Sequence, residues 1–123
     1  MGLPLRKSKV APPPGCPLTE CMALLRGAWA TNVLWYLRGG PRRFGELRAD
    51  IPRISAKVLS ARLRDLEDNG VISRSVLATS PPSVEYALTD LGRELMPVIN
   101  AIAEVGIKLK KKAENTSRKS AAA

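Results

Sequence analysis

Basic residues dominate one stretch of the chain, and their side chains are suited to binding phosphate groups. Between Arg38 and Arg64 there are eight lysine and arginine residues but only two acidic ones, Glu46 and Asp50. The whole chain carries a formal net charge of +9. Such a cluster favours polyphosphate partners, because each neutralised phosphate releases condensed counterions. The stretch therefore predicts a nucleic-acid-binding surface, although a solvated basic surface would show the same composition.

Two cysteines are the other residues with reactive side chains. Because the chain has no histidine and only Cys16 and Cys21 as thiols, it lacks the four ligands of an ordinary zinc site, and we expect no metal and no cofactor. Cys16 precedes a predicted helix that begins at Pro17, where the helix dipole favours a reactive thiolate. Cys16 is therefore a redox-sensing candidate, although a small residue before a helix would look the same. Cys21 is expected in the core.

Neither catalysis nor membrane insertion is indicated. The sequence has no histidine, no glycine-rich loop beside a strand and no paired carboxylates in a predicted cleft, so we expect no enzyme. No apolar run approaches the ~20 residues of a membrane span. The first ten residues lack the apolar region of a signal peptide. We expect a cytoplasmic protein without a membrane partner.

The spacing of apolar residues predicts the elements that position the basic residues. Ser55 is the expected N-cap of a helix whose buried stripe is Leu59, Leu63 and Leu66 and which ends at Asn69-Gly70. The apolar period then changes to two, which predicts a hairpin. The elements expected in order are a helix from Pro17 to Gly27, a helix from Trp29 to Gly39, a short extended piece at 42–44, a short helix with Leu47 and Ile51 buried, the helix from Ser55, strands at 71–77 and 84–88, and a long helix capped by Thr89.

This order of elements predicts an α+β, mostly α fold, the winged helix-turn-helix with a two-stranded wing hairpin. The final helix is expected to carry Leu91, Leu95, Val98, Ile102, Val105 and Leu109 along one side and to kink or restart at Pro97. The expected domains are a flexible, proline-rich basic arm at 1–15, the DNA-binding and dimerisation domain at 16–112 and a disordered tail at 113–123.

The helix that Ser55 caps is the candidate for insertion into the major groove of DNA, which admits one α-helix. Its outward face carries Lys57, Ala61 and Arg64, with Ser60 on a flank. Arg43 and Arg53 flank the preceding short helix and are expected to contact phosphates. The expected DNA-binding residues are Arg43, Arg53, Ser55, Lys57, Ser60, Ala61, Arg64, Arg74, Thr79 and Ser80.

Several short motifs occur in an order that is strongly specific when taken together. They are Cys16-Pro17, Gly27-Ala28-Trp29, the run from Gly40 to Leu47, the run from Ile54 to Leu59, the run from Leu63 to Gly70 and the run from Val84 to Gly92. Over Cys16 to about Gly106, the chain resembles the HxlR-type transcriptional regulators, a winged-helix branch close to the MarR regulators. It departs from them at Ala28, Gly45 and Val105, where lysine, asparagine and tryptophan are common.

The resemblance implies a homodimer that binds double-stranded operator DNA through two winged helices. It also implies dimer contacts through the first and last helices, with Leu18, Met22, Leu95, Ile99 and Ile102 as interface candidates, and a sensing cysteine at the position of Cys16. Repression is expected from family analogy alone. A small-molecule effector is left open, with Trp29, Trp35 and Tyr36 as candidates to line its cavity. The alternatives are a winged-helix protein-interaction module and a non-specific DNA-coating protein that uses the C-terminal lysines.

Overall fold

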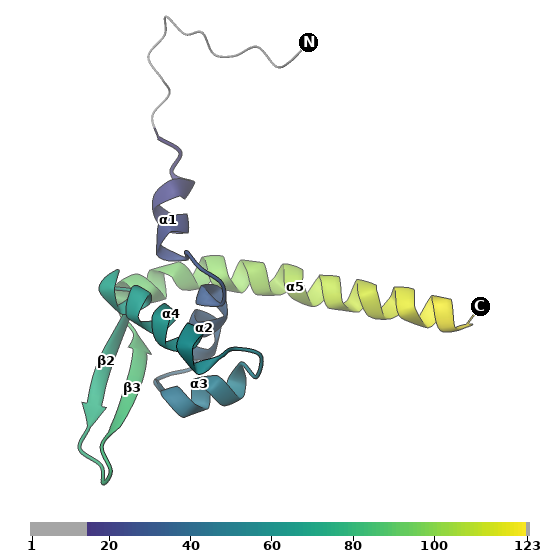
Figure 1. Cartoon of the computed structure of the whole chain (residues 1–123). Coiled ribbons are helices and arrows are strands. Elements are labelled where there is room, and N and C mark those ends of the chain that lie inside the picture. The colour runs from purple at the N-terminus through teal and green to yellow at the C-terminus, as the bar shows by residue number, and fades with distance from the viewer. Residues whose placement is uncertain (1–14, 123) are drawn as a thin grey trace, which may run out of the picture.

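Five helices and a small antiparallel sheet make up residues 15–122, which the computed structural model describes (Figure 1). The elements in chain order are α1 (Leu18–Leu24), α2 (Ala30–Leu37), β1 (Arg42–Arg43), α3 (Phe44–Asp50), α4 (Ala56–Asp68), β2 (Ile72–Leu77), β3 (Ser83–Leu88) and α5 (Asp90–Ala122). This arrangement is the predicted α+β, mostly helical, winged helix-turn-helix. Among the described helices, none is both long and apolar enough to cross a membrane.

The hydrophobic core lies between α2, α3, α4 and the first part of α5. Leu59, Leu63 and Leu66 are at most 2% exposed, and Leu47 and Ile51 are buried beside them, as their spacing predicts. Each such side chain contributes roughly 1.5–3 kcal/mol through removal of apolar surface from water. The stripe of leucines therefore fixes which face of α4 points outward.

The predicted caps of α4 and α5 are confirmed. The Ser55 hydroxyl accepts a hydrogen bond from the Val58 backbone N–H at 3.1 Å. Gly70 has a φ of 74°, a left-handed conformation that suits glycine and ends α4. The Thr89 hydroxyl accepts from the Gly92 N–H at 3.2 Å, at the start of α5. Local capping therefore sets the ends of these helices.

The sheet has the strand order β1–β3–β2, and both pairings are antiparallel. The short strand β1 pairs Arg42 with Tyr86, while β2 pairs Arg74 with the same residue from the other side. The β2–β3 hairpin extends beyond the body of the molecule as the wing (Figure 1). In this view the wing and α3 lie toward one end and α1 toward the other.

Helix α5 is one unbroken helix that is longer than predicted. It does not restart at Pro97, and it remains helical to Ala122, where a disordered tail from residue 113 was expected. Its terminal residues include Ala, Lys, Glu and Arg, which are good helix formers. Leu95 and Ile99, both expected at a dimer interface, are 6% and 3% exposed in the chain's own core, so one chain leaves little of either side chain accessible. The expected arm at 1–15 lies outside the described residues, apart from Gly15.

Candidate nucleic-acid interface

The connection between α3 and α4 holds the candidate DNA-binding helix against the core. Ile51 and Ile54 are each 3% exposed and anchor the two ends of this connection. Since the leucine stripe of α4 faces inward, Lys57, Ser60 and Arg64 are exposed on its outer side. The predicted outward face is thus present, except that Ala61 is half-buried.

Three of the eight arginine and lysine residues between Arg38 and Arg64 make contacts within the chain. Arg42 donates two hydrogen bonds to Asp50, at 3.2 and 2.6 Å, and also lies 3.4 Å from a Glu46 oxygen. The hydrogen bond to Asp50, with the charges of both carboxylates, raises the pKa of Arg42. The guanidinium of Arg38 lies 3.6 Å from the ring centre of Trp35. These arginines stabilise the fold around α3 and α2.

Arg62 is the third of these residues, and it ties α4 to the turn between α1 and α2. Its Nε donates to the Ala28 carbonyl at 2.9 Å, and a terminal nitrogen contacts Asp65 at 2.9 Å. Gly27 has a φ of 94°, and a Cβ there would lie 2.6 Å from the Arg62 Nε. Trp29 also adopts a positive φ, 73°, which is strained for an aromatic residue. The left-handed backbone at position 27 therefore favours glycine, and any other residue would also displace the Arg62 guanidinium.

The remaining basic residues of this stretch are exposed around α3 and α4. Arg43 precedes α3, where its backbone N–H donates to Glu46 at 2.9 Å, and its side chain is exposed. Arg53 is exposed in the connection before α4. Arg48 is also exposed, on α3, although the expected set omits it; its charge was the only signal in the sequence. With Lys57 and Arg64, these side chains give the α3–α4 surface a positive charge.

The wing carries the last group of expected contacts. Arg74 is exposed on β2, and Thr79 and Ser80 are exposed at the tip of the hairpin. The Thr79 hydroxyl donates to the Pro81 carbonyl at 2.8 Å, so one of its hydrogen-bonding roles is already filled within the turn. Ser80 is left as the short polar side chain for an external contact at the tip.

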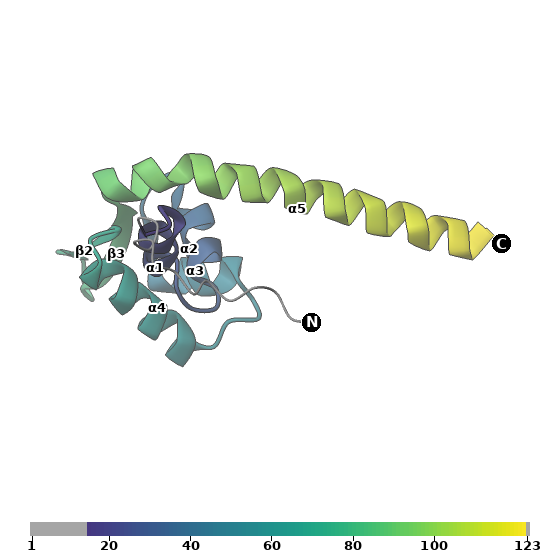
Figure 2. The same cartoon turned by 90° about the horizontal axis from the view of Figure 1, so that it is seen from above.

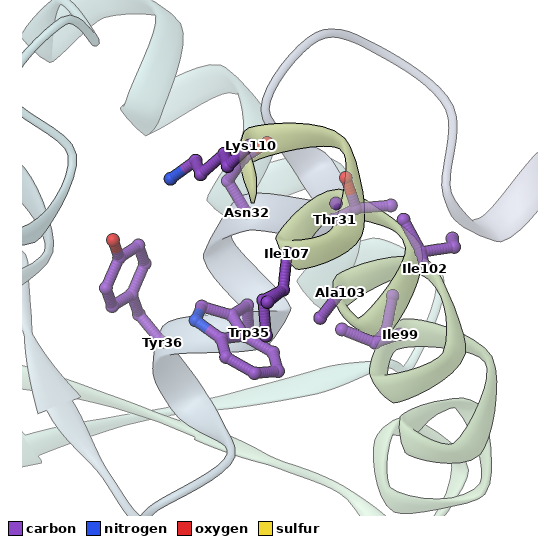
Figure 3. A pocket seen from close by; sticks show the side chains of 10 residues that line it. Thr31, Asn32, Trp35, Tyr36, Ile99, Ile102, Ala103, Ile107 and Lys110 are labelled. Carbon is purple, nitrogen blue, oxygen red and sulfur yellow. The ribbon is translucent and has the colours of Figure 1, made fainter. Parts of the chain in front are cut away.

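An open groove of about 310 Å³ lies between α2 and α5 (Figure 3). Trp35 and Tyr36 line it from α2, as expected for a cavity between the DNA-binding part and the last helix, and Ile107 and Lys110 line it from α5. Trp29 does not line this groove and packs against the core instead. Of the three aromatic candidates, Trp29 therefore lies outside this groove.

One face of α1 is apolar and exposed. No residue of α1 is buried, and Leu18 and Met22 are 67% and 61% exposed. Cys16 is exposed just before this helix, whereas Cys21 is half-buried against the core. Ile102 on α5 is also exposed. Leu18, Met22 and Ile102 are therefore accessible to a second chain, unlike Leu95 and Ile99.

Replacement of Ser55 separates its capping role from its expected DNA contact. Ser55→Ala is expected to lower the free energy of unfolding by about 1 kcal/mol, because the Val58 N–H loses its acceptor. Ser55→Asp keeps an acceptor and the stability, but its charge should weaken DNA binding. Urea denaturation and fluorescence anisotropy measure the two effects. Ser60→Ala on the same helix removes no cap, and equal destabilisation by both alanine variants would contradict the prediction.

A wing beside a helix-turn-helix with an exposed basic face defines the winged-helix class of DNA-binding proteins. The chain belongs to the HxlR-like helix-turn-helix family, whose model matches residues 24–114. It is 42% identical over 96 residues to the HTH-type transcriptional regulator YdeP of Bacillus subtilis, covering 78% of this chain and 75% of YdeP. It is 44% identical over 91 residues to the HTH-type transcriptional regulator sll1512 of Synechocystis, covering 74% of this chain and 67% of the relative.

Solved structures agree with this assignment. The oxidised form of the redox regulator HypR superposes with a TM-score of 0.72 at 34% identity, over 76% of this chain and 96% of HypR. The reduced form of the transcriptional regulator YodB from B. subtilis superposes with a TM-score of 0.64 at 37% identity, over 73% of this chain and 89% of YodB. The protein is thus a transcriptional regulator with a helix-turn-helix DNA-binding domain and a MarR-like fold.

Proposed function

We propose that the protein is a homodimeric, sequence-specific regulator that represses transcription from a pseudo-palindromic operator. The observation that carries this proposal is the exposed basic face of α4, with Lys57 and Arg64 opposite a fully buried leucine stripe. A helix held in this way can enter the major groove and present its side chains to base edges. Enzymatic chemistry forms no part of the proposal.

Each group of exposed residues has a distinct role in this proposal. The outer face of α4 contacts the bases, and the arginines that flank α3 contact phosphates and fix the register of the protein on the duplex. The wing contacts the sugar–phosphate backbone beside the groove. The residues proposed to bind DNA are Arg43, Arg53, Ser55, Lys57, Ser60, Ala61, Arg64, Arg74, Thr79 and Ser80.

Homodimerisation follows from the apolar side chains that one chain leaves exposed. Leu18 and Met22 on α1 and Ile102 on α5 are more than half exposed, and a second copy would cover them. Two symmetric α4 helices then bind half-sites about one helical turn, ~34 Å, apart. The two-fold symmetry of the dimer gives the operator its pseudo-palindromic form.

Selection of bound duplexes from a random library, followed by fluorescence anisotropy with excess random competitor, tests the proposal. We expect one palindromic motif to be enriched and its binding to survive the competitor and to fall steeply with rising salt. Binding that the competitor abolishes would indicate a DNA-coating protein. No enrichment and no binding at low salt would favour a protein-interaction module.

Cys16 is proposed as a redox sensor that changes operator affinity. Its thiol is exposed beside α1, and two similar structures are those of HypR, a redox regulator. Diamide accepts two electrons and two protons when two thiols join in a disulfide, and this bond is proposed to link Cys16 to Cys16 of the partner subunit. The disulfide is expected to change operator affinity about tenfold, a typical allosteric coupling. Cys16→Ser should abolish this response in the anisotropy titration, while Cys21→Ser should retain it. A Cys16→Ser protein that still responds would refute the role of Cys16.

A further inference from the structure

The groove between α2 and α5 lies apart from the DNA contacts proposed above. Seen from above, α5 and α4 lie on opposite sides of the body (Figure 2). Helix α2 packs against both of them. The groove is therefore on the side of α2 away from α4, and its side chains have no role in the proposed DNA contacts.

One face of α5 continues past the core along this groove. Ile99 is buried in the core, whereas Ile102 and Ile107 further along are more than half exposed. Intervals of three and four residues place the lining residues on one side of the helix. These residues are Ile99, Ile102, Ala103, Gly106, Ile107 and Lys110. This face of α5 is thus apolar along its length and ends in a positive charge.

Gly106 keeps the middle of this face open. A Cβ built at this position would meet no side chain and no neighbouring element within 4 Å in residues 15–122, so packing within the described chain does not require glycine. Glycine is nevertheless less favourable than alanine in the interior of a helix. The missing side chain leaves room for a ligand that lies flat against α5.

Helix α2 supplies an aromatic wall with Trp35 and Tyr36. The Arg38 guanidinium lies 3.6 Å from the ring centre of Trp35 and donates to the Trp35 carbonyl at 2.7 Å. This contact holds the indole and places a positive charge beside the groove. An indole held in this way offers a flat surface on which an aromatic ring can stack.

The hydrogen-bond donors of the groove gather on one side of it. In Figure 3 the Lys110 ammonium, the Tyr36 hydroxyl and the indole nitrogen of Trp35 point to the same side. Ile99 and Ile102 lie on the other side in this view. None of the lining residues is acidic, and the ion pairs found within residues 15–122 do not use Lys110. The polar side of the groove therefore suits a carboxylate.

We infer that this groove binds a planar aromatic carboxylate, whose ring lies beside Trp35 and over Gly106 and whose carboxylate accepts hydrogen bonds from Lys110. The volume of about 310 Å³ is at the lower end of the range for small-molecule sites and suits one or two fused rings. Because α2 also contacts α4, a ligand that displaces α2 is expected to change operator affinity about tenfold. Only this effect on DNA rests on the proposed function.

Isothermal titration calorimetry of the full-length protein without DNA tests the site, with 2-naphthoate as the probe and 2-naphthamide as its uncharged equivalent. Lys110→Gln is expected to raise the dissociation constant of 2-naphthoate about tenfold, because a charge-assisted hydrogen bond is lost. The weaker binding of 2-naphthamide should not change. Lys111→Gln is the matched control, since it makes the same charge change about 100° around the helix and outside the groove, and it should bind 2-naphthoate as the wild type does. Equal weakening by both variants would overturn the site and indicate general attraction to the lysines.

Gly106→Leu tests the place of the ring. Its side chain enters open space, so circular dichroism should show an intact fold, and 2-naphthoate binding should be lost. Unchanged binding by this variant would place the ligand elsewhere and overturn the inference. If the wild type binds no 2-naphthoate and Gly106→Leu weakens the dimer, the partner subunit fills the groove and the inference is also overturned.

Fluorescence anisotropy with the selected operator tests the effect on DNA. Saturating 2-naphthoate is expected to change the operator affinity of the wild type about tenfold and to leave that of Gly106→Leu unchanged. If 2-naphthoate binds in the groove but operator affinity stays the same, the coupling through α2 is refuted and the site remains. A wild type that binds the probe but selects no operator would instead refute the proposed function.

Discussion

Replacement of Arg64 by alanine is expected to lower operator affinity by about 100-fold while leaving the fold intact. The side chain is exposed on the outer face of α4, opposite Leu59, Leu63 and Leu66. A contact of this kind contributes about 1–3 kcal/mol, and the homodimer makes it twice. Fluorescence anisotropy with the selected operator measures the loss, and circular dichroism checks the helix content.

The salt dependence of binding decides what Arg64 contacts. If Arg64 binds a phosphate, its removal weakens binding to all duplexes and reduces the slope of log affinity against log salt, by about one for each phosphate that is no longer neutralised. If Arg64 binds a base, its removal relaxes the preference at one position of each half-site instead. Arg118→Ala makes the same charge change on an exposed part of α5 and should retain operator affinity. Similar decreases in affinity for both variants would show that net charge, and not the α4 surface, determines binding.

The substitution Val105→Asp is expected to convert the dimer into a monomer. Val105 is 55% exposed in one chain and lies within one turn of the exposed Ile102 on α5. In the proposed homodimer the change would therefore bury two carboxylates in an apolar contact. The penalty for each unpaired buried charge is several kcal/mol, which corresponds to a dimer dissociation constant raised by at least about 1,000-fold. Light scattering with size-exclusion chromatography measures the mass in solution.

Ile107→Asp is the matched control for this substitution. Ile107 is 52% exposed on the same helix and lines the groove toward α2 (Figure 3). It follows Val105 by two residues, about 200° around the helix, so the two side chains lie on nearly opposite faces. We expect this variant to remain dimeric and to bind operator DNA, while the monomeric Val105→Asp protein loses most of its operator affinity. A dimeric Val105→Asp protein would place the interface elsewhere, with the apolar face of α1 as the remaining surface.

The sequence alone could not predict which basic residues make contacts within the chain. Arg62 looks like a candidate DNA contact from its place among basic residues, but its guanidinium binds the Ala28 carbonyl, 34 residues earlier in the chain. Arg42 is similarly held by Asp50 across α3. Charge and spacing cannot distinguish an arginine that packs within the chain from one that faces solvent, because the partner comes from another element.

On α5, the sequence likewise could not predict which of the expected dimer-interface residues are exposed. The spacing predicts one apolar line, yet Leu95 and Ile99 are buried by the chain's own core, while Ile102 and Val105 remain in water. Periodicity gives the angle of a residue around a helix but not the point at which the helix leaves the body of the protein. That point depends on how far α2 extends beside α5.

The sequence alone determined the order of the elements, the buried leucines of α4 and the caps at Ser55, Gly70 and Thr89. These features depend on residues within a few positions of one another, because helix periodicity and capping act over one or two turns. The tertiary structure alone decided which arginines are used within the fold, where the groove lies and which part of α5 is exposed. Those features depend on contacts between residues far apart in the chain, and only the packed elements bring such residues together.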